Sequence, residues 1–348
     1  MDTNIVTAGL PVLDLGLFDA GPVPRERFLA ELRHAAREVG FFYVEGHGVP
    51  HDLNERTLAA ARAFFALPEA DKLAIAMVRS PQFRGYTRAG GELTRGRPDW
   101  REQVDVGAER SALPRDAGLP AWSRLQGPNQ WPAALPEFRE AVLRWQDEVT
   151  RVLVTLLRAF ALALGQAGDA FAPIYDGAPH QLAKIIRYPG RAAGEDDQGV
   201  GAHKDGGLLS LIYQDGQGGL QVEGPTGWID AAPRPDAFVV NIGELLELAS
   251  DGYLRATVHR VKSPPAGRDR ISLAFFLSAR LDATVPALTL PPQLAAQAGG
   301  HERDPDNPLL RQVGENTLKG RLRSHPDVAA RHHADLIPPL VVSPDGVP

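Results

Sequence analysis

The sequence predicts a mainly β protein with added helices, in which a sandwich or barrel forms the core. From residue 181 onward, seven short apolar runs are separated by glycine, proline and aspartate turns, a spacing that is typical of a sandwich or barrel and not of a Rossmann sheet. Before residue 165, apolar residues recur with the period of helices. The 348 residues are 43% hydrophobic and 23% charged, so the chain can bury a sizeable core.

The N-terminal part of the chain predicts helices with one or two strands. Strands are expected over residues 10–15 and 40–50, and helices over 25–39, 52–66, 68–77 and 136–164. The last helix carries a single apolar stripe, which indicates packing on a sheet. Residues 80–134 are rich in glycine, proline and charge, and we expect a long irregular binding region there. The seven core strands are expected in QLAKIIRYP, LLSLIYQD, GLQVEG, GWIDAAP, AFVVNIG, ATVHRVKSP and RISLAFFLS.

Composition excludes several classes of site. The chain has no cysteine, which rules out disulfides, thiolate catalysis, cysteine-ligated zinc and iron–sulfur clusters, so any metal must be held by His, Asp or Glu. The 37 basic and 43 acidic residues give a net charge of −6, and we expect no nucleic-acid partner. With no apolar stretch long enough for a membrane span and no signal-peptide pattern, we expect a cytoplasmic monomer without membrane contact.

Two histidines and one aspartate form a candidate metal site. In the segment GAHKDGG, His203 and Asp205 are two residues apart, and on extended backbone both side chains point to one face. His259 follows 54 residues after Asp205 in another alternating strand. Two histidines and one carboxylate on one side of a metal are the facial triad of non-haem Fe(II) oxygenases. For the first pair alone, a glycine-rich turn without a metal is the alternative.

An arginine and a serine form a candidate carboxylate receptor. Arg270 and Ser272 point to the same face of the strand RISLAFFLS, while the residues between them point to the other. A guanidinium supported by a hydroxyl is suited to bind a carboxylate. The alternative is a surface ion pair made by Arg270.

These motifs resemble the isopenicillin N synthase-like branch of the 2-oxoglutarate and Fe(II)-dependent oxygenases. Beyond HKD, H and RIS, the similar segments are LPVLDL, GFFYVEGHGVP, FRGYTRAGGELTRGRPDWRE, GPNQWP, RYP, LLSLIYQDGQGGLQV and VVNIGELLELASDGYLRATVHRV, so the resemblance covers roughly residues 9–285. It implies a double-stranded β-helix (jelly-roll) core braced by helices.

The resemblance also implies a role for each site residue. His203, Asp205 and His259 would be the iron ligands, and Arg270 with Ser272 would hold the distal carboxylate of 2-oxoglutarate. Tyr188 occupies the place from which the family often supplies a tyrosine hydroxyl to the same carboxylate. Plant members usually carry Asn-Tyr-Tyr-Pro where this chain has Ile-Arg-Tyr-Pro, so the asparagine is missing here.

The expected organisation is a single globular unit over residues 1–348. Within it we expect an N-terminal region of the non-haem dioxygenase type, a scaffold helix, an Fe(II)/2-oxoglutarate jelly-roll core and a C-terminal extension. These parts are assigned to residues 9–134, 135–180, 181–282 and 283–348.

The function implied by the resemblance is that of a non-haem Fe(II)- and 2-oxoglutarate-dependent dioxygenase. It would use O2 to hydroxylate, desaturate or cyclise a small molecule and would convert 2-oxoglutarate to succinate and CO2. One alternative is a 2-oxoglutarate-independent Fe(II) oxidase of the isopenicillin N synthase type, in which Arg270 holds the carboxylate of the substrate. Another is a non-catalytic jelly-roll binding protein.

The candidate substrate residues are Arg84, Tyr86 and Phe276. The first two lie in the irregular region, and Phe276 lies near the end of the strand that begins at Arg270. A structural ion pair is the alternative for Arg84. The substrate is expected to be a small carboxylate such as an amino acid derivative, or else an apolar natural-product intermediate.

Overall fold

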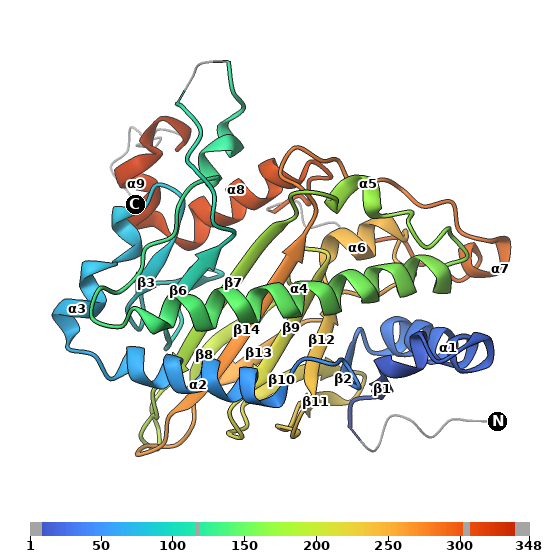
Figure 1. Ribbon diagram of the computed structural model, residues 1–348, viewed down its shortest axis with the longest axis horizontal. Coiled ribbons are helices and arrows are strands. Elements are labelled where there is room, and N and C mark those ends of the chain that lie inside the picture. Colours follow the sequence, from blue (N-terminus) through green and yellow to red (C-terminus); the bar gives the residue numbers. More distant parts are fainter. Residues whose placement is uncertain (1–8, 116–117, 302–306, 338–348) are drawn as a thin grey trace, which may run out of the picture.

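The computed structural model describes residues 9–115, 118–301 and 307–337, which form two facing β-sheets braced by helices (Figure 1). The larger sheet has the strand order β1-β2-β12-β9-β14-β7-β6-β3 and the smaller one β11-β10-β13-β8. The strands of the larger sheet are β1 (Val12–Asp14), β2 (Phe41–Glu45), β12 (Phe238–Ile242), β9 (Leu209–Gln214), β14 (Arg270–Ser278), β7 (His180–Tyr188), β6 (Glu102–Gly107) and β3 (Gly85–Thr87). Those of the smaller sheet are β11 (Gly227–Asp230), β10 (Leu220–Gly224), β13 (His259–Lys262) and β8 (Gln198–His203), and β4 (Leu93–Thr94) pairs with β5 (Arg97–Pro98) in a separate ribbon.

The chain from β7 to β14 winds between the two sheets. β7, β9, β12 and β14 belong to the larger sheet, while β8, β10, β11 and β13 belong to the smaller one. Each pairing between these eight strands is antiparallel. A chain that crosses repeatedly between two antiparallel sheets forms a jelly roll, as the resemblance implied.

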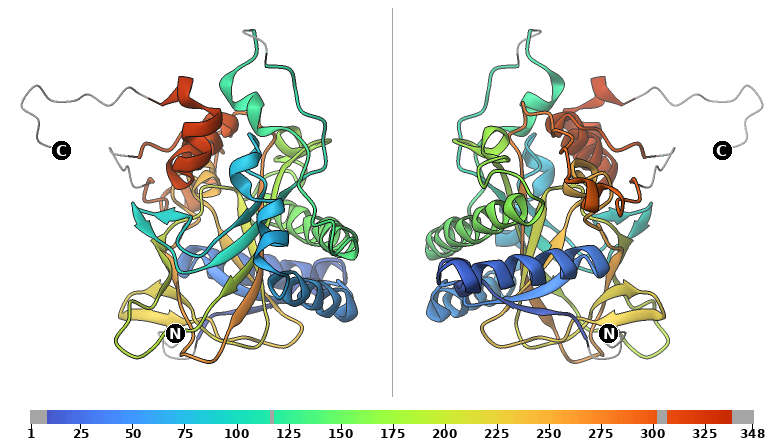
Figure 2. Two further views of the ribbon diagram at one scale, coloured as in Figure 1. Left: turned by 90° about the vertical axis from the view of Figure 1, so that its left-hand side faces the viewer. Right: turned by 90° about the vertical axis from the view of Figure 1, so that its right-hand side faces the viewer.

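Helices cover the outer face of the larger sheet. The side views place α1, α2 and α4 on this face and the smaller sheet on the other, with α8 and α9 at one end of the two sheets (Figure 2). The nine helices of the described residues are α1 (Pro22–Glu38), α2 (His51–Phe65), α3 (Glu69–Ala74), α4 (Glu137–Ala163), α5 (Ala172–Tyr175), α6 (Glu244–Ala249), α7 (Pro292–Ala295), α8 (Val313–Ser324) and α9 (Pro326–His332). Short 3-10 turns are η1 (Leu15–Phe18), η2 (Met77–Arg79), η3 (Ala121–Leu125) and η4 (Ala334–Leu336).

The strand period of two divides the larger sheet into an outer apolar face and a mixed inner face. Along β14, Leu273 and Phe275 are fully buried in the core that includes the helices. Ala274, between them, packs in the core between the two sheets. Arg270 and Ser272 lie on the same inner face as Ala274, so both point into the jelly roll.

Most of the expected elements are confirmed, and two expectations are wrong. All seven expected core strands and the long helix are present. Residues 80–134, however, are not irregular throughout, because they supply β3 and the fully buried β6 to the larger sheet. β8 was also missed: its sequence, QGVGAH, has two glycines, which are unfavourable in isolated strand patterns but are accommodated here by pairing with β13.

We expect Trp145→Ala to destabilise the fold severely. Trp145 of α4 is fully buried, contacts the ring of Phe275 edge to face and donates a hydrogen bond from Nε1 to Oδ1 of Asn54 at 3.0 Å. The cavity and the unpaired amide should lower the free energy of unfolding by about 3–5 kcal/mol. Urea unfolding measures this change, with Trp100→Ala at the surface as control, where the loss should stay below about 1 kcal/mol. Equal losses in both variants would contradict the assignment of Trp145 to the core.

Candidate metal site and its surroundings

The two sheets bring His203, Asp205 and His259 together. His203 ends β8 and lies directly opposite His259, the first residue of β13. Asp205 follows in the turn between β8 and β9, and not on extended strand as the spacing predicted. One ligand atom from each of the three residues lies within 4.8 Å of the others. Oδ1 of Asp205 is 3.4 Å from Nε2 of His203, and Oδ2 is 3.7 Å from Nε2 of His259.

Backbone carbonyls orient both imidazole rings. Nδ1 of His203 lies 2.8 Å from the carbonyl oxygen of Gly201, and Nδ1 of His259 lies 3.2 Å from that of Thr257. Since a carbonyl can only accept, each Nδ1 carries a hydrogen, and in the neutral form of each ring the lone pair of Nε2 lies on the side of Asp205. This is the arrangement in which a histidine ligates a metal through Nε2.

Two side chains of the larger sheet fix the Asp205 carboxylate. Oγ of Ser210 donates a hydrogen bond to its Oδ2 at 2.6 Å, and Nδ2 of Asn241 donates another at 2.9 Å. Burial would raise the pKa of Asp205, but His259, His203 and the bond from Ser210 hold that pKa far below its ordinary range. The carboxylate is therefore ionised and available to a cation.

The electrostatics of the two imidazoles differ. Burial, together with the neighbouring His203, lowers the pKa of His259 to about 4, so its Nε2 is unprotonated at neutral pH. Burial would lower the pKa of His203 as well, but contact with Asp205 raises it above the ordinary value. Two imidazole nitrogens and one carboxylate oxygen, all on one side of a common centre, suit a divalent ion such as Fe(II) and leave its other coordination positions open.

Arg270 is buried without a carboxylate partner. Only 1% of it is exposed. Its Nη2 donates to Oε1 of Gln214 at 2.9 Å and its Nε to the carbonyl oxygen of Gln217 at 3.2 Å. Nη1 has no hydrogen-bond partner among the described residues, although it is buried. Among the described residues, the surface ion pair considered from the sequence is therefore absent, and a carboxylate fits this donor.

Ser272 and Tyr188 surround Arg270 as the motif implied. The guanidinium carbon of Arg270 lies 4.9 Å from the centre of the Tyr188 ring, and the two residues are directly opposite each other on β14 and β7. Ser272 is the next residue after Arg270 whose side chain points to the inner face of β14, and it pairs with Gln214 of β9. The structure thus brings all three predicted cosubstrate residues to one end of the jelly roll. The hydroxyl contact of Tyr188 with a carboxylate stays a prediction.

The structure separates the three candidate substrate residues. Phe276 lies on the inner face of β14, opposite Ser210, and so next to the side chain that holds Asp205. Arg84 is buried and makes no ion pair among the described residues. Tyr86 lies on the outer face: it packs in the core beneath the helices, and its hydroxyl donates to Oε2 of Glu102 at 2.5 Å. The expectation that Tyr86 lines the pocket therefore has no support from its position.

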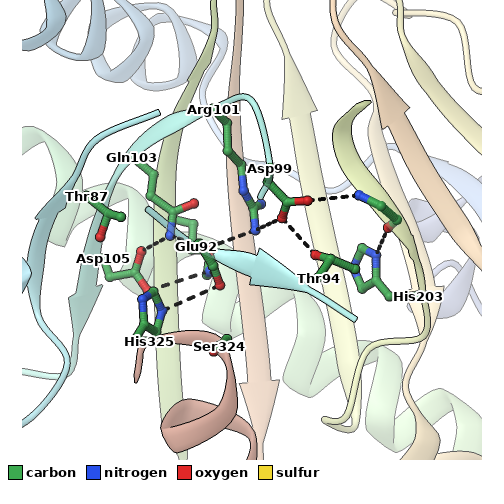
Figure 3. A network of polar contacts seen from close by, with 12 residues as sticks. Thr87, Glu92, Thr94, Asp99, Arg101, Gln103, Asp105, His203, Ser324 and His325 are labelled. Atoms are coloured by element: carbon green, nitrogen blue, oxygen red, sulfur yellow. Dashed lines mark hydrogen bonds and ion pairs between the residues drawn. The ribbon is translucent and has the colours of Figure 1, made fainter. Parts of the chain in front are cut away.

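A buried polar network, which the sequence did not predict, lines the inner face beside the metal site (Figure 3). Glu92 accepts hydrogen bonds from Nη2 of Arg101 at 2.8 Å, from Nε2 of Gln103 at 2.6 Å and from Nζ of Lys184 at 2.7 Å. Asp105 accepts from Gln103 at 2.7 Å. The alternation of polar residues at 101, 103 and 105 was the signal in the sequence, since it places them on one face of a strand.

This network reaches both the metal site and the C-terminal helices. Oδ1 of Asp99 accepts from the backbone nitrogen of Gly201 at 3.0 Å, and Gly201 in turn orients His203 (Figure 3). From α8, Nη1 of Arg321 donates to Asp105 at 2.8 Å and lies 3.2 Å from Nε2 of His325. The segment expected as a C-terminal extension therefore supplies side chains to the wall of the jelly roll.

Comparison with known proteins identifies the family. The profile of the 2OG-Fe(II) oxygenase superfamily matches residues 179–279, and that of the N-terminal region of non-haem dioxygenases in morphine synthesis matches residues 10–134. The 2-oxoglutarate-dependent dioxygenase frbJ of Dothideomycetidae sp. is 35% identical, over 92% of this chain and 91% of that protein. A homoarginine-6-hydroxylase of Arabidopsis thaliana is 38% identical, over 75% of this chain and 79% of its own.

A solved structure agrees with this result. The full-length T7H of Neurospora crassa, crystallised with alpha-KG (2-oxoglutarate), superposes with a TM-score of 0.73 at 25% identity and covers 89% of this chain and 95% of its own. The chain belongs to the 2-oxoglutarate–Fe(II) oxygenase superfamily. It is a non-haem dioxygenase that uses Fe(II), 2-oxoglutarate and O2 to oxidise a small molecule.

Among the described residues, no helix has the length and apolar character needed to cross a membrane.

We expect Ser210→Ala to weaken metal binding by about 10- to 100-fold, because Asp205 loses one of the two donors that orient its carboxylate. Anaerobic titration with Fe(II), or with Mn(II) as a redox-stable substitute, gives the dissociation constant. Ser324→Ala on α8 is the matched control, since within the described part of the chain its hydroxyl donates to the carbonyl oxygen of Gly320 in the same helix. Unchanged affinity in Ser210→Ala would show that this hydrogen bond does not position the ligand.

We expect His325→Gln to reduce the acid sensitivity of the fold. Burial lowers the pKa of His325 to about 4; among its neighbours, Arg321 and Lys184 act in the same direction, and Glu92 and Asp105 oppose them. The folded pKa thus lies below the value of about 6.5 in the unfolded chain. The contribution of neutral His325 is complete above pH 6.5 and is lost as the pH falls towards 4.

Between pH 7 and pH 4 the free energy of unfolding of the unsubstituted protein should therefore fall by up to about 3 kcal/mol more than that of His325→Gln. Urea unfolding at several pH values measures both curves. Parallel curves would contradict a buried, neutral His325.

Proposed function

We propose that His203, Asp205 and His259 hold the Fe(II) of this dioxygenase. Their ligand atoms lie within 4.8 Å of one another, the carboxylate is ionised, and both Nε2 atoms are turned towards it. The donor set of two nitrogens and one oxygen fits Fe(II) and leaves room for a chelating cosubstrate.

Arg270 and Ser272 hold the distal carboxylate of 2-oxoglutarate, and Tyr188 borders the same position. The observation that carries this assignment is the buried Nη1 of Arg270, which has no partner in the described chain. A buried guanidinium donor left unpaired is costly, and a carboxylate would satisfy it. In the protein, Gln214 and the carbonyl of Gln217 occupy the other donors and so fix the orientation of the guanidinium.

Fe(II) held by these residues, together with 2-oxoglutarate and O2, would supply the oxidising chemistry that converts 2-oxoglutarate to succinate and CO2. The chain itself contributes geometry and exclusion of water. Phe276, on the inner face opposite Ser210, provides an apolar wall next to the metal ligands. We propose hydroxylation of the substrate as the outcome, in keeping with the name of the Arabidopsis relative, a hydroxylase.

The remaining sequence expectations fit this proposal. We infer a cytoplasmic monomer of the isopenicillin N synthase-like branch, without nucleic-acid or membrane partners. The net charge of −6 supports the absence of a nucleic-acid partner. Separate N-terminal, scaffold, jelly-roll and C-terminal parts remain our proposed organisation of the chain.

We expect Arg270→Met to raise the dissociation constant of 2-oxoglutarate by about 10- to 100-fold, because a charge-assisted hydrogen bond is lost. Anaerobic absorption measures it: in the unsubstituted protein, a visible charge-transfer band should need both Fe(II) and 2-oxoglutarate. His203→Ala should abolish the band. Arg280→Met, at a half-buried position just beyond the end of β14, should leave the titration unchanged.

Iron binding without this band would favour the 2-oxoglutarate-independent oxidase, with Arg270 holding a substrate carboxylate. Failure to bind either ligand would contradict the enzyme assignment and favour a binding protein.

A further inference from the structure

Four arginines are buried in the described part of the chain, and only two of them have a carboxylate partner. These four are Arg84, Arg101, Arg270 and Arg321. Arg101 pairs with Glu92 and Asp99, and Arg321 pairs with Asp105. Arg270 has the free donor assigned above to 2-oxoglutarate. Arg84 is therefore the second buried guanidinium without an anion.

Arg84 is 4% exposed, and its Nε has no hydrogen-bond partner among the described residues. Burial, together with the neighbouring Arg321 and Arg110, lowers the pKa of Arg84 to about 9 against the opposing attraction of Asp105, so the group remains charged at neutral pH. A buried cation that is kept charged without a direct ion pair is unfavourable unless a ligand supplies the opposite charge.

The position of Arg84 relates it to the metal site. One row of directly paired residues crosses four neighbouring strands of the larger sheet. It consists of Ser210 of β9, Phe276 of β14, Leu182 of β7 and Gly107 of β6. At one end of this row, Ser210 bonds the metal ligand Asp205. At the other end, the guanidinium of Arg84 lies against Gly107, where an added Cβ would be 2.4 Å from Nη2. With strands about 4.8 Å apart, the row spans roughly 14 Å.

The charges around Arg84 leave an excess of positive charge. The buried groups of this inner wall are the four cations Arg84, Arg101, Lys184 and Arg321 and the three carboxylates Glu92, Asp99 and Asp105. Each of the three carboxylates already accepts hydrogen bonds from the chain. Nη2 of Arg321 and Nε of Arg101 are further buried donors without a hydrogen-bond partner among the described residues. One further negative charge would balance the wall.

A small cavity at the ends of β6 and β7 borders Arg84, and its lining also includes Arg110 and His180. Burial and the nearby guanidinium groups of Arg84, Arg321 and Arg110 hold the pKa of His180 well below its ordinary value. His180 is therefore neutral and does not supply the missing charge, although it can take part in a hydrogen bond.

We propose that Arg84 is the receptor for a carboxylate on the substrate, with the free donor of Arg321 as its second contact. The substrate class is then a small monocarboxylic acid. Its carboxylate lies within about 14 Å of the carbon that is oxidised, and the half-buried Phe276 and Leu182 contact the segment in between. The single excess charge among the fully buried groups of the wall matches the charge of one carboxylate. This inference rests on the proposed function, because it requires that the metal bound by Asp205 lies next to the carbon of the substrate that is oxidised.

The absence of a side chain at Gly107 is part of this receptor. A Cβ at this position would collide with the guanidinium of Arg84 at 2.4–2.5 Å. Gly107→Ala should therefore displace the guanidinium of Arg84 without removing its charge. This variant tests whether binding depends on the position of the guanidinium and not only on its charge.

The test uses the anaerobic complex of the protein with Fe(II) and saturating 2-oxoglutarate, so that Arg270 is already occupied. Calorimetric titration compares α-amino acids and linear and aryl monocarboxylic acids with their primary amides, which have nearly the same shape but no charge. At least one acid should bind the unsubstituted protein about 10- to 100-fold more tightly than its amide. Arg84→Met and Gly107→Ala should lose this preference, and Arg84→Lys should recover part of it.

Arg88→Met is the matched control, because Arg88 is exposed and pairs with Glu69. It should keep the preference for the acid. The inference is overturned if no acid binds better than its amide, or if Arg84→Met retains the preference. The charge-transfer band is recorded first in every variant: its absence in the unsubstituted protein would reject the proposed function, whereas its presence without any acid preference would reject only the Arg84 receptor.

Discussion

The pairing of β8 with β13 is the constraint on which the site depends. It sets His203 opposite His259 in the smaller sheet, while the carboxylate of Asp205 is held by Ser210 and Asn241 from the larger one. The three ligand atoms can therefore converge only when both sheets are in register. A slip of β13 by one residue would turn His259 to the other face of its strand. Folding of the jelly roll and formation of the metal site are thus the same event.

The inner face of the larger sheet beside the metal site carries buried charged side chains, although apolar side chains there would avoid the cost of removing charges from water. Glu92, Asp105, Lys184 and Arg321 are each buried and connected by hydrogen bonds, so the network carries little net desolvation penalty only while every member is paired. Two buried guanidinium groups, those of Arg84 and Arg270, have no carboxylate partner among the described residues, and they lie at separate positions around the metal site. We interpret both as binding groups, one for the cosubstrate and one for the substrate. Stability alone does not account for either.

Much of this architecture could be predicted from the sequence, because its signals are local. The period of two in RISLAFFLS correctly placed Arg270 and Ser272 on one face of their strand, and the resemblance brought together ligands 54 residues apart. β6 and β8 were missed because their polar residues and glycines are compensated only by pairing with distant strands. The face occupied by Tyr86 depends on the register between β3 and β6, which one sequence does not reveal. The same holds for α8, whose Arg321 meets Asp105 across more than 200 residues.

The central claim is that one jelly roll positions the metal through His203, Asp205 and His259 and the cosubstrate through Arg270. A crystal structure of the anaerobic complex with Fe(II) and 2-oxoglutarate, with the iron located by its anomalous scattering, tests it most directly. The account predicts a single iron bound by the two Nε2 atoms and the Asp205 carboxylate, with the distal carboxylate of 2-oxoglutarate on Nη1 of Arg270. Iron bound elsewhere, or 2-oxoglutarate without contact to Arg270, would contradict it.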